Sequence, residues 1–187
     1  MKRFFLLLSL AIISVSAFAQ DKNKEQSKEN DPLDISAELQ KVSDLGIPTV
    51  ETVALKKEKA DILYVEEQWS DAIDAYLDFA RDANWLSNII AQCLEPFYSA
   101  SYDDRKNVSL TFLNKWRPYE NTANDYKRQR NRAYIRVGLC FKKLGDIEKA
   151  VAYLYKGLDL VDMKSSEDWN AAVEALTEIV GYSPTSK

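Results

Sequence analysis

Histidine is absent from this 187-residue chain, and cysteine occurs only twice. Without histidine, the serine–histidine and cysteine–histidine pairs of nucleophilic catalysis are excluded, together with the commonest zinc sites. No glycine-rich phosphate-binding loop occurs. Adjacent carboxylates stand at 66–67 and 103–104, but neighbouring side chains on a helix point about 100° apart, so neither pair forms an acid–base couple. We therefore expect no enzymatic activity, no cofactor and no metal ion.

Glycine and proline are scarce, with five residues of each, and apolar residues do not alternate with polar ones as they do in strands. Helix-forming residues dominate, which predicts an all-α protein. The formal net charge is −4. This charge argues against a nucleic-acid partner, because nucleic-acid-binding proteins usually present a basic face.

One basic cluster departs from this acidic balance. It lies within one predicted helix and consists of Lys127, Arg128, Arg130, Arg132 and Arg136. It is interpreted either as a basic strip that contacts an acidic partner segment or as a solvated helix face, and the second is the more frequent role of such runs.

The N-terminus carries an apolar run, residues 4–18, that follows two basic residues. Ala17-Phe18-Ala19 is a small-x-small cleavage site before Gln20, so 1–19 is predicted to be a secretory signal peptide cleaved between Ala19 and Gln20. The alternative, a retained anchor, needs about 20 apolar residues, which is longer than this run. The AFAQ ending resembles the export signals of Bacteroidota. We expect a periplasmic or secreted protein.

The remainder divides into two parts. Residues 20–34 are polar and of mixed charge, and are predicted to be a flexible spacer. Residues 35–187 have the length and apolar content of one helical domain. No second long apolar run occurs, so no membrane span is expected.

Residues 131–162 carry the most informative pattern of the chain. They read as two antiparallel helices joined at Gly145-Asp146, residues suited to a helix C-cap and to the next N-cap. Small residues let helix axes approach closely, and large residues fill the grooves beside the crossing. The small residues are Gly138, Ala150 and Gly157, and the large ones are Tyr134, Phe141 and Leu154.

This pattern resembles the tetratricopeptide repeat, a family that pairs two helices in 34 residues and stacks the pairs into a right-handed superhelix that binds other proteins. One departure is Asp162, where the family often has proline. The alternative is an ordinary helical hairpin with the same spacing. The resemblance implies a stack of antiparallel hairpins with a C-terminal capping helix.

A weaker copy lies at 53–82. Its matching residues are Ala60, Leu63, Ala72 and Tyr76. It departs from the pattern at Lys56, which replaces an aromatic residue, at the turn, which lacks glycine, and at Phe79, which replaces a small residue.

The segment between the copies is predicted to be a further pair of helices, about 85–95 and 103–116, which leaves the number of repeats within 83–130 open. Proline cannot continue a helix interior, so Pro96 and Pro118 are expected to end these helices. The apolar face of the first is predicted to carry Trp85, Ile89, Cys93 and Phe97. A last helix is expected to cap the stack with Trp169, Val173, Leu176 and Val180 on one face.

Cys93 and Cys140 are either a disulfide pair, which an exported protein could form, or two buried thiols. Both lie within predicted helices near their apolar sides, which favours the thiols.

The resemblance also implies where a partner would bind, because first-helix residues line the inner groove of this family. The groove residues are predicted to be Arg132, Ile135, Leu139, Lys142 and Lys143 in the strong copy, and Lys57, Asp61 and Tyr64 in the weaker one. We expect a non-catalytic periplasmic module for protein–protein interaction, whose partner is an envelope component of assembly or transport. The alternative is a carbohydrate- or small-ligand-binding protein that uses its aromatic surfaces.

Overall fold

A computed structural model describes residues 34–161 and 166–182. Every regular element in these two ranges is an α-helix, and neither contains a strand. The prediction of an all-α protein is confirmed. The predicted signal peptide, 1–19, and all but the last residue of the predicted spacer, 20–34, lie outside the described residues.

Helix α1, Ser36–Leu45, belongs to a compact unit that ends at Ile47, and the other helices belong to a second unit, Pro48–Lys187. The predicted helical domain, 35–187, spans this boundary. Gly46 follows the last residue of α1 and has φ of 70°, a value that glycine adopts without strain. No residue of α1 is buried.

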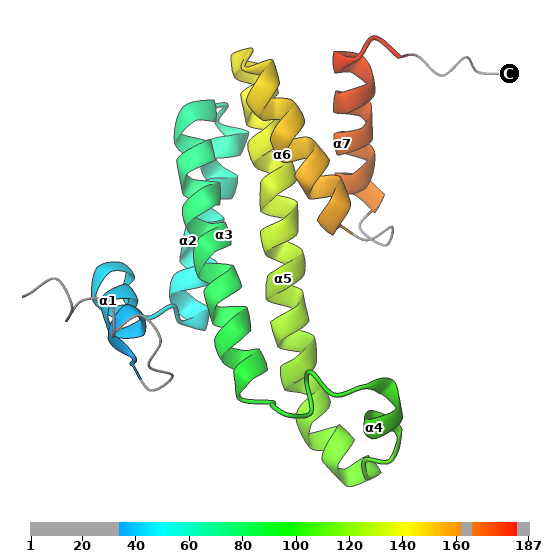
Figure 1. Ribbon diagram of the computed structural model, residues 1–187. Helices are drawn as coiled ribbons and strands as arrows, with labels where there is room; N and C mark the ends of the chain where they lie inside the picture. The colour runs from blue at the N-terminus through cyan, green and yellow to red at the C-terminus, as the bar shows by residue number, and fades with distance from the viewer. Residues whose placement is uncertain (1–33, 162–165, 183–187) are drawn as a thin grey trace, which may run out of the picture. The chain divides into compact units, whose positions relative to one another are not determined.

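The second unit is built from helical hairpins. Helices α2 and α3 form one hairpin, α3 and α5 lie antiparallel along each other, α5 and α6 form a second hairpin, and α7 packs on α5 and α6 (Figure 1). The bounds are Val50–Val65 for α2, Trp69–Gln92 for α3, Tyr102–Lys106 for α4, Leu110–Leu144 for α5, Ile147–Leu160 for α6 and Ser166–Ile179 for α7.

The second hairpin packs as closely as its small residues predict. Gly138 and Ala150 are buried, as is Leu154. A Cβ atom added at Gly138 would lie 2.7 Å from Leu154 Cγ and 2.9 Å from its backbone nitrogen. A Cβ added at Gly157 would lie 2.5 Å from Ile135 Cγ1. Only glycine leaves room for α5 and α6 to approach this closely.

The turn of this hairpin also follows the prediction. Gly145 ends α5 in the left-handed conformation, with φ of 80°. Asp146 then caps α6, because its side chain accepts a hydrogen bond from the backbone N–H of Lys149 at 3.1 Å.

The first hairpin makes its turn without glycine. Glu67 follows the C-terminus of α2 and has φ of 60°, the left-handed region that L residues adopt only at a cost. This turn therefore carries backbone strain at Glu67, a position where glycine would fit without strain.

We expect Glu67→Gly to raise the free energy of unfolding by about 0.5–1 kcal/mol. Glycine removes the strain of the left-handed conformation, and the larger conformational entropy of glycine in the unfolded chain offsets only part of this gain. Glu66→Gly is the matched control, because Glu66 has φ of −77° and should lose stability instead. Urea unfolding of both variants measures the difference, and a destabilised Glu67→Gly chain would show that the turn carries no strain.

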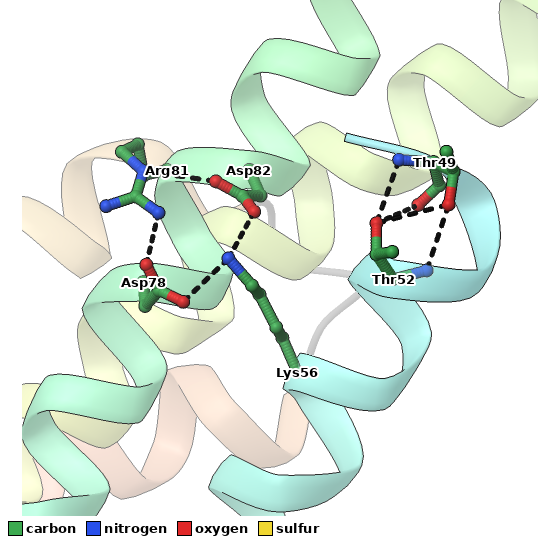
Figure 2. Close-up of polar contacts among 6 residues, drawn as sticks. All are labelled: Thr49, Thr52, Lys56, Asp78, Arg81 and Asp82. Atoms are coloured by element: carbon green, nitrogen blue, oxygen red, sulfur yellow. Dashed lines mark hydrogen bonds and ion pairs between the residues drawn. The ribbon is translucent and has the colours of Figure 1, made fainter. Parts of the chain in front are cut away.

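Helices α2 and α3 are joined by an ionic network where the repeat pattern expects an aromatic residue (Figure 2). Lys56 Nζ lies 2.5 Å from Asp82 Oδ2 and 2.7 Å from Asp78 Oδ2. Arg81 contacts both carboxylates, with its Nε 3.0 Å from Asp82 Oδ1. The Asp82 side chain is only 6% exposed. At this position an ion pair between Lys56 and a buried carboxylate thus replaces the packing of the aromatic side chain that the repeat pattern expects.

The predicted pair of helices between the two copies does not exist as a separate hairpin. Helix α3 continues without a break to Gln92, and α5 already begins at Leu110. The segments 85–95 and 103–116 are largely the distal ends of these two long helices, with α4 in the connection between them (Figure 1).

The break expected at Pro118 is wrong, because this proline lies inside α5. Proline removes one helix hydrogen bond, the one to the carbonyl of Asn114. Pro118 and Asn114 are both exposed, so water can replace that bond. The Thr122 hydroxyl donates to the Pro118 carbonyl at 2.9 Å in the following turn.

The apolar face predicted for 85–97 is partly wrong. Ile89 is 38% exposed and Cys93 is exposed, whereas Phe97 is buried. The buried side of this part of α3 carries Leu86, Ser87 and Ala91 instead. Ser87 Oγ donates to the carbonyl of Ala123 at 2.9 Å, which satisfies the buried hydroxyl against α5.

Helix α7 covers the end of the second hairpin, but with a face rotated from the predicted one. Ala172 and Ala175 are buried against Ile135 and Leu154, with Leu176 and Ile179 packed beside them. Val180 is 71% exposed, so its predicted place on the packing face is wrong. Small residues at the contact let α7 approach α5 and α6 closely.

Candidate functional site: a groove between α2 and α5

Four of the eight predicted groove residues meet in one cavity of about 340 Å³. They are Lys57, Asp61 and Tyr64 of α2 and Arg132 of α5. Helices α3 and α7 complete the walls. The other lining residues are Val65, Tyr76, Phe79, Gln129, Ala133, Arg136, Glu167 and Asp168.

The remaining four predicted residues do not line this cavity. Ile135 is fully buried in the cluster beneath α7, so its predicted place in the groove is wrong. Leu139 is half-buried and packs on the same cluster. Lys142 forms an ion pair with Glu178 of α7, and Lys143 is exposed. Helix α7 lies over this part of α5, which sequence spacing alone could not reveal.

The groove has an aromatic centre. The Tyr64 ring packs edge-on against Trp69, with centroids 5.4 Å apart, and against Tyr76, at 6.1 Å. The Arg136 guanidinium carbon lies 4.9 Å from the Tyr64 ring centroid. Stacking on an aromatic face stabilises a guanidinium and fixes its orientation. Tyr64 is therefore held on two sides by rings and on a third by a cation.

Hydrogen bonds fix the polar wall. The Tyr76 hydroxyl donates to Asp61 Oδ1 at 2.7 Å, and Lys57 Nζ donates to Asp61 Oδ2 at 2.5 Å. Burial, and then the hydrogen bond to Asp61, raise the pKa of Tyr76 well above its ordinary value of 10.0. The phenol thus keeps its proton at neutral pH and remains a donor.

Two arginines of α5 converge on one carboxylate of α7. Arg132 Nε lies 3.1 Å from Asp168 Oδ2, and a terminal nitrogen of Arg136 lies 3.6 Å from Asp168 Oδ1. Burial opposes the charge of Arg136, but Tyr64, Tyr76 and Asp168 outweigh it and raise the pKa of the guanidinium. The sequence singled out Arg136 only as part of the basic cluster, and Asp168 not at all.

The basic cluster does not form one strip. Arg128 pairs with Asp125, Lys127 Nζ donates to Tyr98 at 3.0 Å, and Arg130 reaches Asn131 and Asn84. Only the last two members, Arg132 and Arg136, face the groove. Spacing alone could not distinguish them, because Arg128 lies four residues before Arg132 on the same helix face and pairs with Asp125 instead.

A second cavity, of about 560 Å³, adjoins the first and is lined by residues of α2 from Val50 to Val65. The two cavities share Lys57, Asp61, Val65 and Gln129. The added walls are mostly aliphatic, with Val50, Val53, Ala54 and Ile62 beside Glu58, Glu66 and Tyr126. Val65, at the junction, is 80% exposed. The groove therefore has an apolar part and a charged part, in which Lys57, Arg132 and Arg136 lie among Asp61, Glu167 and Asp168.

The two cysteines lie outside this groove and are both free thiols. Cys140 is buried and Cys93 is exposed, so the expectation of two buried thiols is correct for Cys140 alone. Burial raises the pKa of the Cys140 thiol to about 11, partly offset by Arg136. A thiol with so high a pKa is a poor nucleophile at neutral pH.

Within residues 34–161 and 166–182, no group of three or more cysteine, aspartate or glutamate side chains is placed to hold a metal ion. In the same part of the chain, no helix has the length and apolar character needed to cross a bilayer.

Comparisons with protein-family models, with curated proteins and with solved structures give no match. The tetratricopeptide resemblance consequently depends on the residues of the two hairpins themselves.

Proposed function

We propose that this chain is a non-catalytic, tetratricopeptide-repeat-like module that binds an extended segment of a partner protein in the groove between α2 and α5. In this proposal α2–α3 and α5–α6 are the two repeat hairpins and α7 is the capping helix. The supporting observation is that the first helix of each hairpin lines one groove, where Lys57, Asp61, Tyr64 and Arg132 meet.

The groove suits a peptide better than a compact small molecule. Its two cavities share Lys57, Asp61, Val65 and Gln129, and the walls change from mostly aliphatic in one to aromatic and charged in the other. An extended peptide presents a series of side chains to such a surface, with apolar contacts for affinity and charged contacts for orientation. We propose that the partner is an exported or envelope protein, since the N-terminal segment resembles a secretory signal.

An array of octapeptides tests this proposal. Each peptide consists of valine and alanine, with one aspartate or one asparagine placed at each position in turn. The probe is the fluorescently labelled mature chain, starting at Gln20. We expect binding to peptides that carry aliphatic side chains. Val65→Asp should weaken that binding at least about tenfold, because it introduces a charge into the wall that the two cavities share.

Leu55→Asp is the matched control, since Leu55 is also an exposed aliphatic residue of α2, at 58% against 80% for Val65, but lines neither cavity. Both variants should unfold within about 0.5 kcal/mol of the wild type, as exposed substitutions usually do. Equal binding by the two variants, or no binding to any peptide, would refute the peptide groove.

Carbohydrate binding is the second candidate, and one feature favours it. Phe112, Trp116 and Tyr119 form a row along the first part of α5, with neighbouring ring centroids 5.8 Å apart. Phe112 is 37% and Tyr119 54% exposed. Aromatic faces of this kind can stack on sugar rings. Quenching of tryptophan fluorescence by a glycan panel, with no octapeptide bound, would favour this candidate over the peptide groove.

A further inference from the structure

Asp168 lies in the charged part of the groove, although it does not belong to either hairpin. It lies in the first turn of α7, and its side chain is only 12% exposed. Arg132 and Arg136, its partners, are 48% and 34% exposed. The chain thus supplies its own carboxylate to the two arginines that would receive a ligand.

Two converging guanidinium ions recognise a carboxylate well, since both are permanently charged and donate along fixed directions. The contact distances of 3.1 and 3.6 Å show an imperfect fit, in which only the first is a good hydrogen-bond length. The position of the Asp168 carboxylate is limited by its attachment to α7. A ligand carboxylate that enters from the open groove has no such limit and can approach both arginines more closely.

Resting on the function proposed above, we propose that Asp168 acts as a built-in competitor of an acidic residue of the ligand. The ligand is then a peptide that combines one aspartate or glutamate with aliphatic side chains. Its carboxylate replaces Asp168 at Arg132 and Arg136, and its aliphatic side chains enter the cavity beside Val50 and Ile62.

Asp168 can yield its place because α7 is attached by other contacts. Ala172 and Ala175 are buried against Ile135 and Leu154. At the far end of the helix, Glu178 pairs with Lys142. A change of the Asp168 side-chain rotamer opens its place beside the two arginines without detaching α7. The affinity for an acidic ligand is therefore reduced by the fraction of time that Asp168 occupies the site.

The octapeptide array distinguishes this role from a structural one. Asp168→Asn removes the competing charge and retains the side-chain shape. We expect it to bind aspartate-containing peptides about tenfold more tightly than the wild type, as for a competitor that occupies the site nine-tenths of the time. Affinity for the asparagine versions of the same peptides should not change.

Glu174→Gln is the matched control, because it removes the same charge from an exposed position of α7 that lines neither cavity. Arg132→Gln provides the opposite test: it should lower the affinity for an aspartate peptide to that for its asparagine version. Similar affinities of Asp168→Asn and Glu174→Gln for aspartate peptides would overturn the competitor role and leave the peptide groove intact. Loss of all binding in Val65→Asp and Leu55→Asp alike would overturn the groove itself.

Discussion

Gly138→Ala is expected to destabilise the chain by about 1–3 kcal/mol, although alanine is normally the better helix residue by about 1 kcal/mol. The added methyl would lie 2.9 Å from the backbone nitrogen of Leu154. A backbone atom of α6 cannot rotate away as a side-chain terminus can, so the two helices must separate. Gly138→Leu should prevent the hairpin from closing as it does here.

The measurement is the free energy of unfolding from urea denaturation followed by circular dichroism. Ala152→Leu is the control, because it enlarges an exposed residue of α6 in the same hairpin and should change stability by less than about 0.5 kcal/mol. A Gly138→Ala chain as stable as the wild type would mean that α5 and α6 do not cross closely at this residue.

Asp82→Asn should cost about 1.5–3 kcal/mol, the range for a buried hydrogen bond to a charged group. Asp78→Asn, which touches the same lysine and arginine, should cost less than about 1 kcal/mol. The two carboxylates differ in burial, with side chains 6% and 40% exposed. Burial, rather than the number of ion pairs, is therefore predicted to set the cost, and equal losses in the two variants would contradict this.

The pH dependence of the same network has a defined sign. Burial opposes ionisation of Asp78, but Lys56 and Arg81 outweigh it and lower its pKa below the ordinary value of 3.8. A carboxylate whose pKa is lowered in the folded state stabilises the protein at pH values above its unfolded-state pKa. This stabilisation is lost as the pH falls through the folded-state pKa. The stability difference between wild type and Asp78→Asn should thus be constant near neutrality, begin to fall near pH 3.8, and vanish only below the lowered folded-state pKa.

The local features of the hairpins were predictable because they depend on neighbours in sequence. Gly145 and Asp146 form the predicted caps, and Gly138 and Ala150 are buried as their spacing requires. The length of α5 was not predictable from Pro118, since a proline adds a cost of one lost hydrogen bond and a steric clash, and a helix continues where its other contacts outweigh that cost. At this exposed position water can replace the lost hydrogen bond.

Half of the predicted groove residues line the cavity, and these are the ones whose positions depend on local sequence. Lys57, Asp61 and Tyr64 follow from the face of one helix, and that face is a local property. Ile135 was misplaced because α7, which covers it, comes about 30 residues later in the chain. Asp168 was missed because no sequence spacing relates it to Arg132, and their contact exists only through the packing of α7 on α5.

The most direct measurement of the central claim, that the α2–α5 groove binds peptide, is calorimetric titration of one array-selected octapeptide into Val65→Asp and Leu55→Asp. We predict that Leu55→Asp keeps the wild-type dissociation constant, and that Val65→Asp weakens binding at least about tenfold, which corresponds to about 1.4 kcal/mol. Dissociation constants that agree within error for the two variants would place the binding surface elsewhere on the molecule.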